Sequence, residues 1–363
     1  MQHKTMLIMA GGTGGHVFPA LAVADYLRLQ GIRVYWLGTL SGLEARIVPE
    51  NGYELLPIRI SGVRGKGILK WLYAPFMLLI NVLHSILLLH RIKPDAVLGM
   101  GGFVSAPGGI AAWLTGIPLF IHEQNSILGL TNRLLAPFAR VMMEGFPGTF
   151  KTGNKVRTTG NPVRRDLVSL AQPDQRLSAR IRNPLHLLVI GGSQGARILN
   201  RKIPDTLKIL DTDTRLEVMH QAGERNYTET VQRYEAIKDK FHVRIEPFID
   251  NMVEAYTWAD IVLCRAGALT IAEICAVGIA SILVPFPHAV DDHQTTNARF
   301  LSDSGCAILL PEPELEAGKL AEVLNRLINT REAIVEMARL ARSLAKPEST
   351  RLVGDICLEH VYA

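Results

Sequence analysis

The sequence predicts an α/β fold with two Rossmann-like domains, each built on a doubly wound parallel sheet. The chain has 363 residues, which is long for a single hydrophobic core. Short β-forming runs alternate with helical stretches throughout, as they do where helices cross over between parallel strands. A strand, a glycine-rich turn and a helix follow one another in MLIMAGGTGGHVFPALAVADYL and again in LHLLVIGGSQGARILNRKI. We therefore expect each copy to open a domain of its own.

The first domain is expected over residues 1–160. Its strands should be buried on both faces, because several of the apolar runs are nearly continuous and lack polar alternation. The predicted strands are Met6–Ala10, Arg33–Gly38, Leu55–Ile60, Ala96–Met100, Pro118–His122 and Val141–Gly145.

The second domain is expected over residues 161–344, and a last helix, about 345–363, is expected to join the first domain. Gly160 and the pair Asn161-Pro162 interrupt any continuing helix or strand, so the boundary is predicted there. The predicted strands are Leu185–Ile190, Arg215–His220, His242–Phe248, Ile261–Cys264, Ser281–Pro285 and Ala307–Leu310. In two facing open sheets, ligands bind at the carboxyl edges of the strands, which predicts a site in the cleft between them.

One predicted helix, Trp71–Leu89, is unusually apolar. Its length corresponds to about 28 Å, just enough to span a bilayer. It also contains Pro75, and Asn81, His84 and Ser85 line one narrow face that is unsuited to lipid. Three interpretations stay open: a helix buried in the domain, a helix partly exposed at a membrane surface, and a transmembrane span. Basic residues flank the stretch and favour a membrane surface, namely Lys66, Lys70, Arg91 and Lys93.

Composition and charge exclude several classes of protein. Apolar residues make up 48% of the chain and charged residues 20%, which is typical of a folded soluble protein. The four cysteines form no CxxC pair, which argues against a disulfide scaffold or a structural zinc, and the start has too short an apolar run for a signal peptide. Residues 1–160 carry 15 Lys and Arg against 7 Asp and Glu (+8), and residues 161–363 carry 24 against 27 (−3). The basic half predicts phosphates or a membrane surface as partner; without a nucleic-acid-binding signature, nucleic acid is not expected.

The turn Gly11–Gly15 follows a strand and precedes a helix, an arrangement that brings backbone N–H groups close to an anion. The spacing is not GxGxxG and no acidic residue ends the second strand, so a dinucleotide cofactor is disfavoured; no P-loop motif is present either. His16 closes the turn. A neutral imidazole there can accept a proton, with a purely structural histidine as the alternative.

The second glycine turn, Gly191–Gly195, has two interpretations. Its G-x-S-x-G pattern around Ser193 matches the nucleophile elbow of α/β-hydrolases, and His293 follows in the expected chain order. Alternatively, Ser193 and neighbouring N–H groups bind phosphate. The hydrolase interpretation leaves the matching turn at Gly11–Gly15 unexplained.

The segment RAGALTIAE, Arg265–Glu273, follows the strand IVLC and opens a helix. The N–H groups of Ala268–Thr270 would meet an anion there, helped by the helix dipole. Glu273 could accept hydrogen bonds from two ribose hydroxyls, or it could be an ordinary surface residue. Neither Asp211-Thr212-Asp213 nor Asp291-Asp292-His293 offers convincing metal-ligand geometry, so no metal is predicted.

The motifs GGTGGHVFPALAVA, ISGVRGKG, VLGMGGFVSAPGG, IHEQN, GNPVR, GGSQGA and RAGALTIAE together closely resemble the MurG family. These are the UDP-N-acetylglucosamine:undecaprenyl-pyrophosphoryl-muramoyl-pentapeptide N-acetylglucosaminyltransferases of bacterial peptidoglycan synthesis. The similarity runs from Met6 to beyond Asn297. It implies the GT-B fold, inversion at the anomeric carbon, and activity without a required metal or other cofactor.

The resemblance also implies roles for individual residues. UDP-N-acetylglucosamine would lie mainly on the second domain, with Ser193 and Arg164 on the diphosphate, the Ile249 backbone on uracil and Glu273 on the ribose. The implied donor-binding residues are Thr13, Gly14, Gly15, Asn125, Arg164, Ser193, Ile249, Ala268, Leu269, Thr270, Ile271, Ala272, Glu273 and Gln294. The motif ISGVRGKG lies in a glycine-rich basic loop, in which Arg64 and Lys66 would contact the acceptor pyrophosphate; a merely solvated loop is the alternative.

The implied reaction joins N-acetylglucosamine to undecaprenyl-pyrophosphoryl-MurNAc-pentapeptide in a β-1,4 linkage, with His16 as general base. The implied location is the cytoplasmic side of the inner membrane, with anionic lipids and other cell-wall synthesis proteins as partners. A binding or regulatory protein of the same fold, without turnover, is the alternative from another class.

Overall fold

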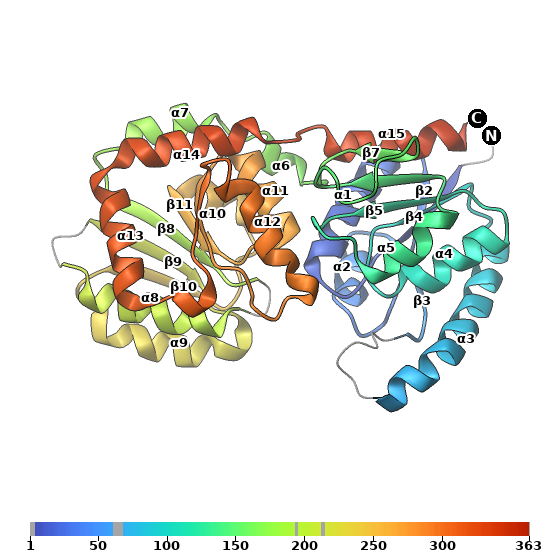
Figure 1. The fold of residues 1–363 in the computed structure, drawn as a ribbon, viewed down its shortest axis with the longest axis horizontal. Helices are drawn as coiled ribbons and strands as arrows, with labels where there is room; N and C mark the ends of the chain where they lie inside the picture. The colour runs from blue at the N-terminus through green and yellow to red at the C-terminus, as the bar shows by residue number, and fades with distance from the viewer. Residues whose placement is uncertain (1–3, 61–67, 193–194, 212–214, 363) are drawn as a thin grey trace. The chain divides into compact units, whose positions relative to one another are not determined.

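The computed structural model describes residues 4–60, 68–192, 195–211 and 215–362, and the chain forms two compact units (Figure 1). The N-terminal unit comprises Met1–Arg164 and Lys346–Ala363, and the C-terminal unit comprises Arg165–Ala345. The division therefore comes after Arg164 rather than after Gly160. Hydrogen bonds hold the intervening residues to the first unit: Asn161 Nδ2 donates to the carbonyl of Gln124 (2.9 Å), and Thr350 Oγ1 donates to the carbonyl of Val163 (3.2 Å).

The N-terminal unit contains a seven-stranded parallel sheet in the order β3-β2-β1-β4-β5-β6-β7. Its strands are β1 (Thr5–Met9), β2 (Arg33–Gly38), β3 (Glu54–Pro57), β4 (Ala96–Gly99), β5 (Leu119–Glu123), β6 (Val141–Glu144) and β7 (Val156–Thr158). The sequence predicted all but β7. That strand has three residues, two of them exposed, and lies at the edge of the sheet, so it has no apolar run to reveal it.

Helices cover both faces of this sheet. They are α1 (Gly14–Leu29), α2 (Glu44–Glu50), α3 (Ile68–Ile92), α4 (Ser105–Leu114), α5 (Leu130–Leu135) and the C-terminal α15 (Ser349–Val361). Helix α15 packs along α1 (Figure 1). Gly354 allows this close approach, because a Cβ at that position would lie 2.4 Å from the ring of Tyr26. The Tyr26 hydroxyl donates to Asp355, which ties the two helices together.

The C-terminal unit repeats the architecture with a six-stranded parallel sheet in the order β10-β9-β8-β11-β12-β13. Its strands are β8 (Leu185–Ile190), β9 (Leu216–Gln221), β10 (His242–Glu246), β11 (Ile261–Cys264), β12 (Ala280–Leu283) and β13 (Ala307–Leu309). Its helices are α6 (Arg165–Val168), α7 (Pro173–Leu177), α8 (Arg197–Ile209), α9 (Tyr227–Tyr234), α10 (Met252–Trp258), α11 (Ala268–Val277), α12 (His293–Ser302), α13 (Ala317–Asn329) and α14 (Arg331–Ser343). The predicted α/β class with two parallel-sheet units is confirmed.

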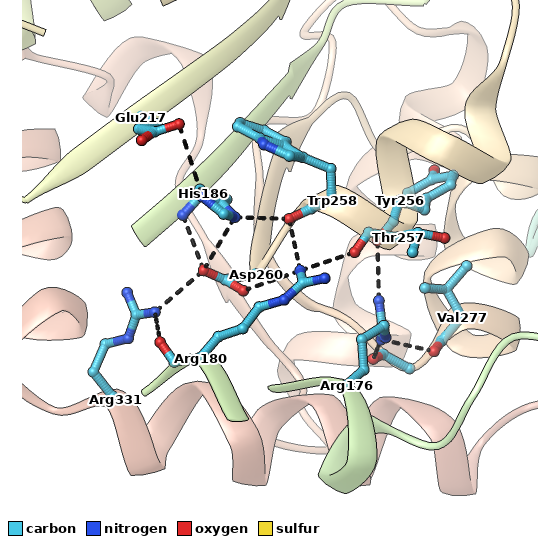
Figure 2. Close-up of polar contacts among 11 residues, drawn as sticks. Arg176, Arg180, His186, Glu217, Tyr256, Thr257, Trp258, Asp260, Val277 and Arg331 are labelled. Atoms are coloured by element: carbon cyan, nitrogen blue, oxygen red, sulfur yellow. Dashed lines mark hydrogen bonds and ion pairs between the residues drawn. The ribbon is translucent and has the colours of Figure 1, made fainter. Parts of the chain in front are cut away.

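A buried ionic network closes the amino edge of the second sheet (Figure 2). The side chain of Asp260, only 2% exposed, precedes β11 and accepts from the N–H of His186 (3.0 Å). The same carboxylate pairs with Arg331 (3.1 Å) and lies 3.9 Å from Arg180. Burial lowers the pKa of the neighbouring Arg176 to about 10, and that guanidinium donates to carbonyls at the ends of α10 and α11. Three cationic side chains thus fix the start of β11 and the helix ends beside it.

Helix α3 exposes an apolar stripe, so the interpretation of a helix wholly buried in the domain is wrong. Within it, Pro75–Ile92 has a mean hydropathy of 1.6 and is long and apolar enough to cross a membrane, yet only 22% of this segment is buried. We call the following side chains the α3 stripe: Tyr73, Phe76, Leu79, Leu83 and Leu87, which are 54–69% exposed.

The sequence analysis expected Asn81, His84 and Ser85 on one face of α3, but the structure divides them between two faces. Asn81 and Ser85 are buried against the unit, where Asn81 Nδ2 donates to the carbonyls of Arg59 (3.1 Å) and Met77 (2.8 Å). His84 is exposed beside the stripe. On the buried face the amide of Asn81 is therefore hydrogen-bonded, whereas the buried Ser85 Oγ has no hydrogen-bond partner among the described residues; the exposed face is predominantly apolar.

Candidate active site

The first glycine turn is held by a buried carboxylate that the sequence analysis missed. Glu44 is fully buried; its Oε2 accepts from Gly12 N (3.0 Å), and its Oε1 accepts from the N–H (3.0 Å) and the hydroxyl (2.7 Å) of Thr39. A Cβ on Gly11 would lie 2.6 Å from the same carboxylate, which explains a glycine there. Glu44 thereby ties the turn after β1 to the end of β2.

His16 lies in the first turn of α1 and is half-buried. Its Nδ1 is 3.1 Å from Oε1 of Gln124, which follows β5. A Cβ on Gly101, which has φ 95°, would lie 2.5 Å from the same Nδ1. The carboxyl ends of β1, β4 and β5 thus meet around this imidazole, as predicted for adjacent parallel strands.

The segment His122–Asn125 lies at the end of β5, at the same edge of the sheet. His122 is buried, and its Nε2 donates to the carbonyl of Gly160 (3.0 Å); burial lowers its pKa to about 4, so the ring is neutral near pH 7. Glu123 accepts from the N–H of Asn125 (3.1 Å) and from Asn132 Nδ2 (2.9 Å). Glu123 therefore fixes the loop that carries Asn125, a role that the sequence analysis did not assign.

The N-terminal unit brings together some of the predicted residues. Thr13, Gly14 and Gly15 surround the start of α1 next to His16, and Asn125 follows the neighbouring strand β5. Arg164 is the last residue of the first of the two segments that form this unit. Arg64, Lys66 and Ser193 lie outside the described residues, so their predicted roles stay predictions.

In the C-terminal unit, Gln221 links two of the predicted donor loops. Its Nε2 donates to the carbonyl of Gly192 (2.9 Å), and its Oε1 accepts from the N–H of Ile249 (3.1 Å). The N–H of Ile249, expected to serve uracil, therefore has a protein partner in this structure. A Cβ on Gly195 would lie 2.0 Å from the carbonyl of Ala222, so this turn requires glycine.

Helix α11 starts at Ala268, the first residue of the predicted anion-binding segment. Gly267 is its N-cap in an extended conformation, and the first-turn N–H groups of any helix have no partner within the helix. Glu273, half-buried one turn further along, accepts from the Tyr256 hydroxyl (3.2 Å). Leu269, Thr270, Ile271 and Ala272 complete the turn. Backbone donors and a carboxylate thus lie on the first two turns of one helix, as diphosphate and ribose would require.

The loop after β12 is anchored by two predicted motifs. Gln294 Oε1 accepts from the N–H of Phe286 (3.0 Å), and Arg265 donates to the carbonyls of Val284 and Pro285 (3.1 Å each). Arg265 also pairs with Glu312. Within the described ranges, no group of three or more His, Cys, Asp or Glu residues could hold a metal ion.

Comparison with known proteins identifies the family. The profile of the glycosyltransferase family 28 N-terminal domain matches residues 6–143, and that of its C-terminal domain matches residues 186–352. A UDP-N-acetylglucosamine--N-acetylmuramyl-(pentapeptide) pyrophosphoryl-undecaprenol N-acetylglucosamine transferase from Nitrosococcus oceani is 52% identical, over 98% of both chains. The enzyme of the same name from Marinobacter nauticus is 50% identical, over 98% of this chain and 97% of its own.

A solved structure supports the same family assignment. The crystal structure of Acinetobacter baumannii MurG is 40% identical, covers 98% of this chain and 99% of its own, and superposes with a TM-score of 0.84. A transferase relationship over nearly the whole chain favours the phosphate-binding interpretation of Gly191–Gly195 over the hydrolase elbow. The chain belongs to glycosyltransferase family 28, within the MurG group of N-acetylglucosaminyltransferases.

Proposed function

We propose that this chain transfers N-acetylglucosamine from UDP-N-acetylglucosamine to undecaprenyl-pyrophosphoryl-MurNAc-pentapeptide. The observation that carries this function is the 52% identity over 98% of both chains to a relative bearing that activity in its name. The glycine turns and the start of α11 at the sheets' carboxyl edges support it. Radiolabel transfer from UDP-N-acetylglucosamine to a lipid-linked muramoyl-peptide, with EDTA present, tests the transfer and its metal independence together. Binding of UDP without turnover would indicate a binding protein of the same fold.

The proposed mechanism is a single in-line displacement. The acceptor hydroxyl attacks the anomeric carbon while His16 accepts its proton, and UDP leaves from the opposite face, which inverts the configuration and gives a β-1,4 linkage. The leaving diphosphate gains negative charge as the bond breaks. The first-turn N–H groups of α11, together with Ser193 and Arg164, would stabilise that charge.

Glu273→Ala should weaken UDP binding by about 1–3 kcal/mol, because the ribose hydroxyls lose a charged acceptor. Its carboxylate is held in place by Tyr256 and lies on the helix whose first turn faces the anion. Isothermal titration calorimetry with UDP measures the change. Glu322→Ala, an exposed substitution on α13, is the matched control. Unchanged affinity in the Glu273 variant would reject the ribose role.

We also propose that the N-terminal unit docks on the cytoplasmic face of the inner membrane through the α3 stripe. The stripe exposes five large apolar side chains on one helix, which supports insertion into the interfacial region of a bilayer. Arg91 and Lys93 at the end of α3 are exposed, and anionic headgroups attract such residues by about 1 kcal/mol each. The net charge of +8 on residues 1–160 acts in the same direction. Other cell-wall synthesis proteins are proposed as further partners.

Replacing Phe76 and Leu83 with Glu should reduce binding to anionic vesicles at least about tenfold, since burial of one such side chain contributes about 1.5–3 kcal/mol. Cosedimentation with anionic and neutral vesicles measures this. Ile209→Glu, an equally exposed apolar position in the C-terminal unit, is the control.

The triple change of Lys66, Lys70 and Lys93 to Glu should weaken binding to anionic vesicles and leave UDP affinity intact. Equal binding of the native chain to both vesicle types at low salt would exclude an electrostatic contribution to membrane binding. Resistance to carbonate extraction would instead indicate that α3 spans the membrane.

A further inference from the structure

The side chain of Gln124 connects the imidazole of His16 to the main chain. It is 1% exposed and follows β5 directly. Its Nε2 donates to the carbonyl of Met100 (2.8 Å), and its Oε1 lies 3.1 Å from His16 Nδ1. The amide thus spans from the end of β4 to the first turn of α1.

The orientation of this amide follows from hydrogen-bonding chemistry. A backbone carbonyl can only accept, so the group of Gln124 that faces Met100 must be its NH₂. The group that faces His16 is then the amide oxygen, which also only accepts. His16 Nδ1 must therefore carry the hydrogen, and in a neutral imidazole Nε2 is left with the lone pair.

Hydrogen bonds hold the main chain that the amide faces and the main chain that carries it. The N–H of Met100 donates to the carbonyl of Met9 (2.8 Å), so this stretch of backbone is held at the sheet edge. Asn161 Nδ2 donates to the main-chain carbonyl of Gln124 (2.9 Å), which fixes the backbone that carries the amide. A flipped amide would place its oxygen against the Met100 carbonyl and its NH₂ against Nδ1–H, losing both hydrogen bonds.

Gly101 makes room for the pair. A Cβ there would lie 2.5 Å from His16 Nδ1 and 3.2 Å from Gln124 Oε1. Its φ of 95° is also a conformation that favours glycine. Only glycine therefore fits at position 101 beside the contact between His16 and Gln124.

We infer that Gln124 is a positioning residue that holds His16 as the Nδ1–H tautomer, with Nε2 as the proton-accepting atom. The inference rests on the proposed role of His16 as general base and specifies the atom that acts. A neutral amide fixes the tautomer without adding a negative charge that would favour the imidazolium. Among the ionisable groups of the surrounding elements, burial keeps His122 neutral, and the carboxylates of Glu44 and Glu123 already accept hydrogen bonds, from Gly12 and Thr39 and from Asn125 and Asn132 respectively.

Nitrogen-15 NMR of the imidazole side chains tests the tautomer directly, with the His16 signals assigned by their loss in His16→Gln. The native chain should show a protonated Nδ1 and an unprotonated Nε2. Gln124→Leu should shift the population toward the Nε2–H form, which is the favoured tautomer of free imidazole side chains. It should also lower kcat by roughly 10²-fold or more with little change in UDP affinity, since a wrong tautomer costs up to about 10⁴-fold in a serine protease.

Gln124→Glu provides a second variant of nearly identical shape, in case the leucine variant folds poorly. Its carboxylate loses the hydrogen bond to the Met100 carbonyl, but it should keep Nδ1–H as a donor and move the acidic limb of the kcat/KM pH profile to higher pH, because it stabilises the imidazolium. A native spectrum with Nε2–H, or a leucine variant with an unchanged tautomer, would overturn the inference. If His16→Ala retains its kcat, the proposed base fails even where the NMR result stands, so the two failures are distinguishable.

Discussion

His16→Ala lowers kcat by roughly 10²–10⁴-fold, the effect expected when a general base is removed, and changes donor binding much less. The reason is the position of the imidazole, which is half-buried at the carboxyl edge of the first sheet and hydrogen-bonded through Nδ1 to Gln124. Steady-state transfer kinetics at saturating UDP-N-acetylglucosamine measure kcat, and calorimetry measures donor affinity separately.

The control for this experiment is His242→Ala, because that ring is 79% exposed in the other unit and should be silent. A variant of His16 with nearly native kcat and a raised KM for the donor would make His16 a binding residue, and the base would have to be sought elsewhere at this edge.

Asp260→Ala should lower the free energy of unfolding of the C-terminal unit by about 3–5 kcal/mol, the usual effect of removing one partner from a buried ion pair. The change leaves Arg331, whose side chain is 11% exposed, without its carboxylate and removes the acceptor for the His186 N–H (Figure 2). Hydrogen–deuterium exchange should show faster exchange in β8 and β11 and no change in β1.

Asp205→Ala is the matched control for this substitution, because Asp205 pairs with Lys208 on the exposed surface of α8, where an ion pair contributes about 0–1 kcal/mol. A stability loss for Asp260→Ala no larger than for the control would mean that Arg331 and Arg180 find other partners, and that the carboxylate is not what fixes this edge.

The sequence was sufficient for every strand of the two sheets except the edge strand β7, and for the turns at their carboxyl edges. A short apolar run such as LHLLVI that ends in glycines is typical of a buried strand, and a glycine turn that follows such a strand lies at the edge where ligands bind. The sequence could not show which distant side chains hold those turns. Glu44 and Gly12, or His16 and Gln124, are separated by 32 and 108 positions, and neither partner carries a local signal.

Helix α3 shows a different limit. Its composition is equally compatible with a buried and an exposed apolar helix, and only its neighbours decide which face is covered. Asn81 is buried because it finds the carbonyls of Arg59 and Met77, and nothing in the periodicity of the helix predicts those acceptors. The same holds for Gln221, whose two partners come from different loops.

The return of α15 to the N-terminal unit has a consequence for how the chain is made. Val353, Cys357 and Val361 are at most 4% exposed and belong to the same core cluster as the apolar face of α1. These residues follow the whole C-terminal unit in the chain, so during synthesis the first unit emerges long before its last core helix. Until then the apolar face of α1 stays uncovered on the nascent chain, which exposes it to chaperone binding or to aggregation. The C-terminal unit is continuous in sequence and can complete its core first, so the two units should mature in the reverse of their order of synthesis.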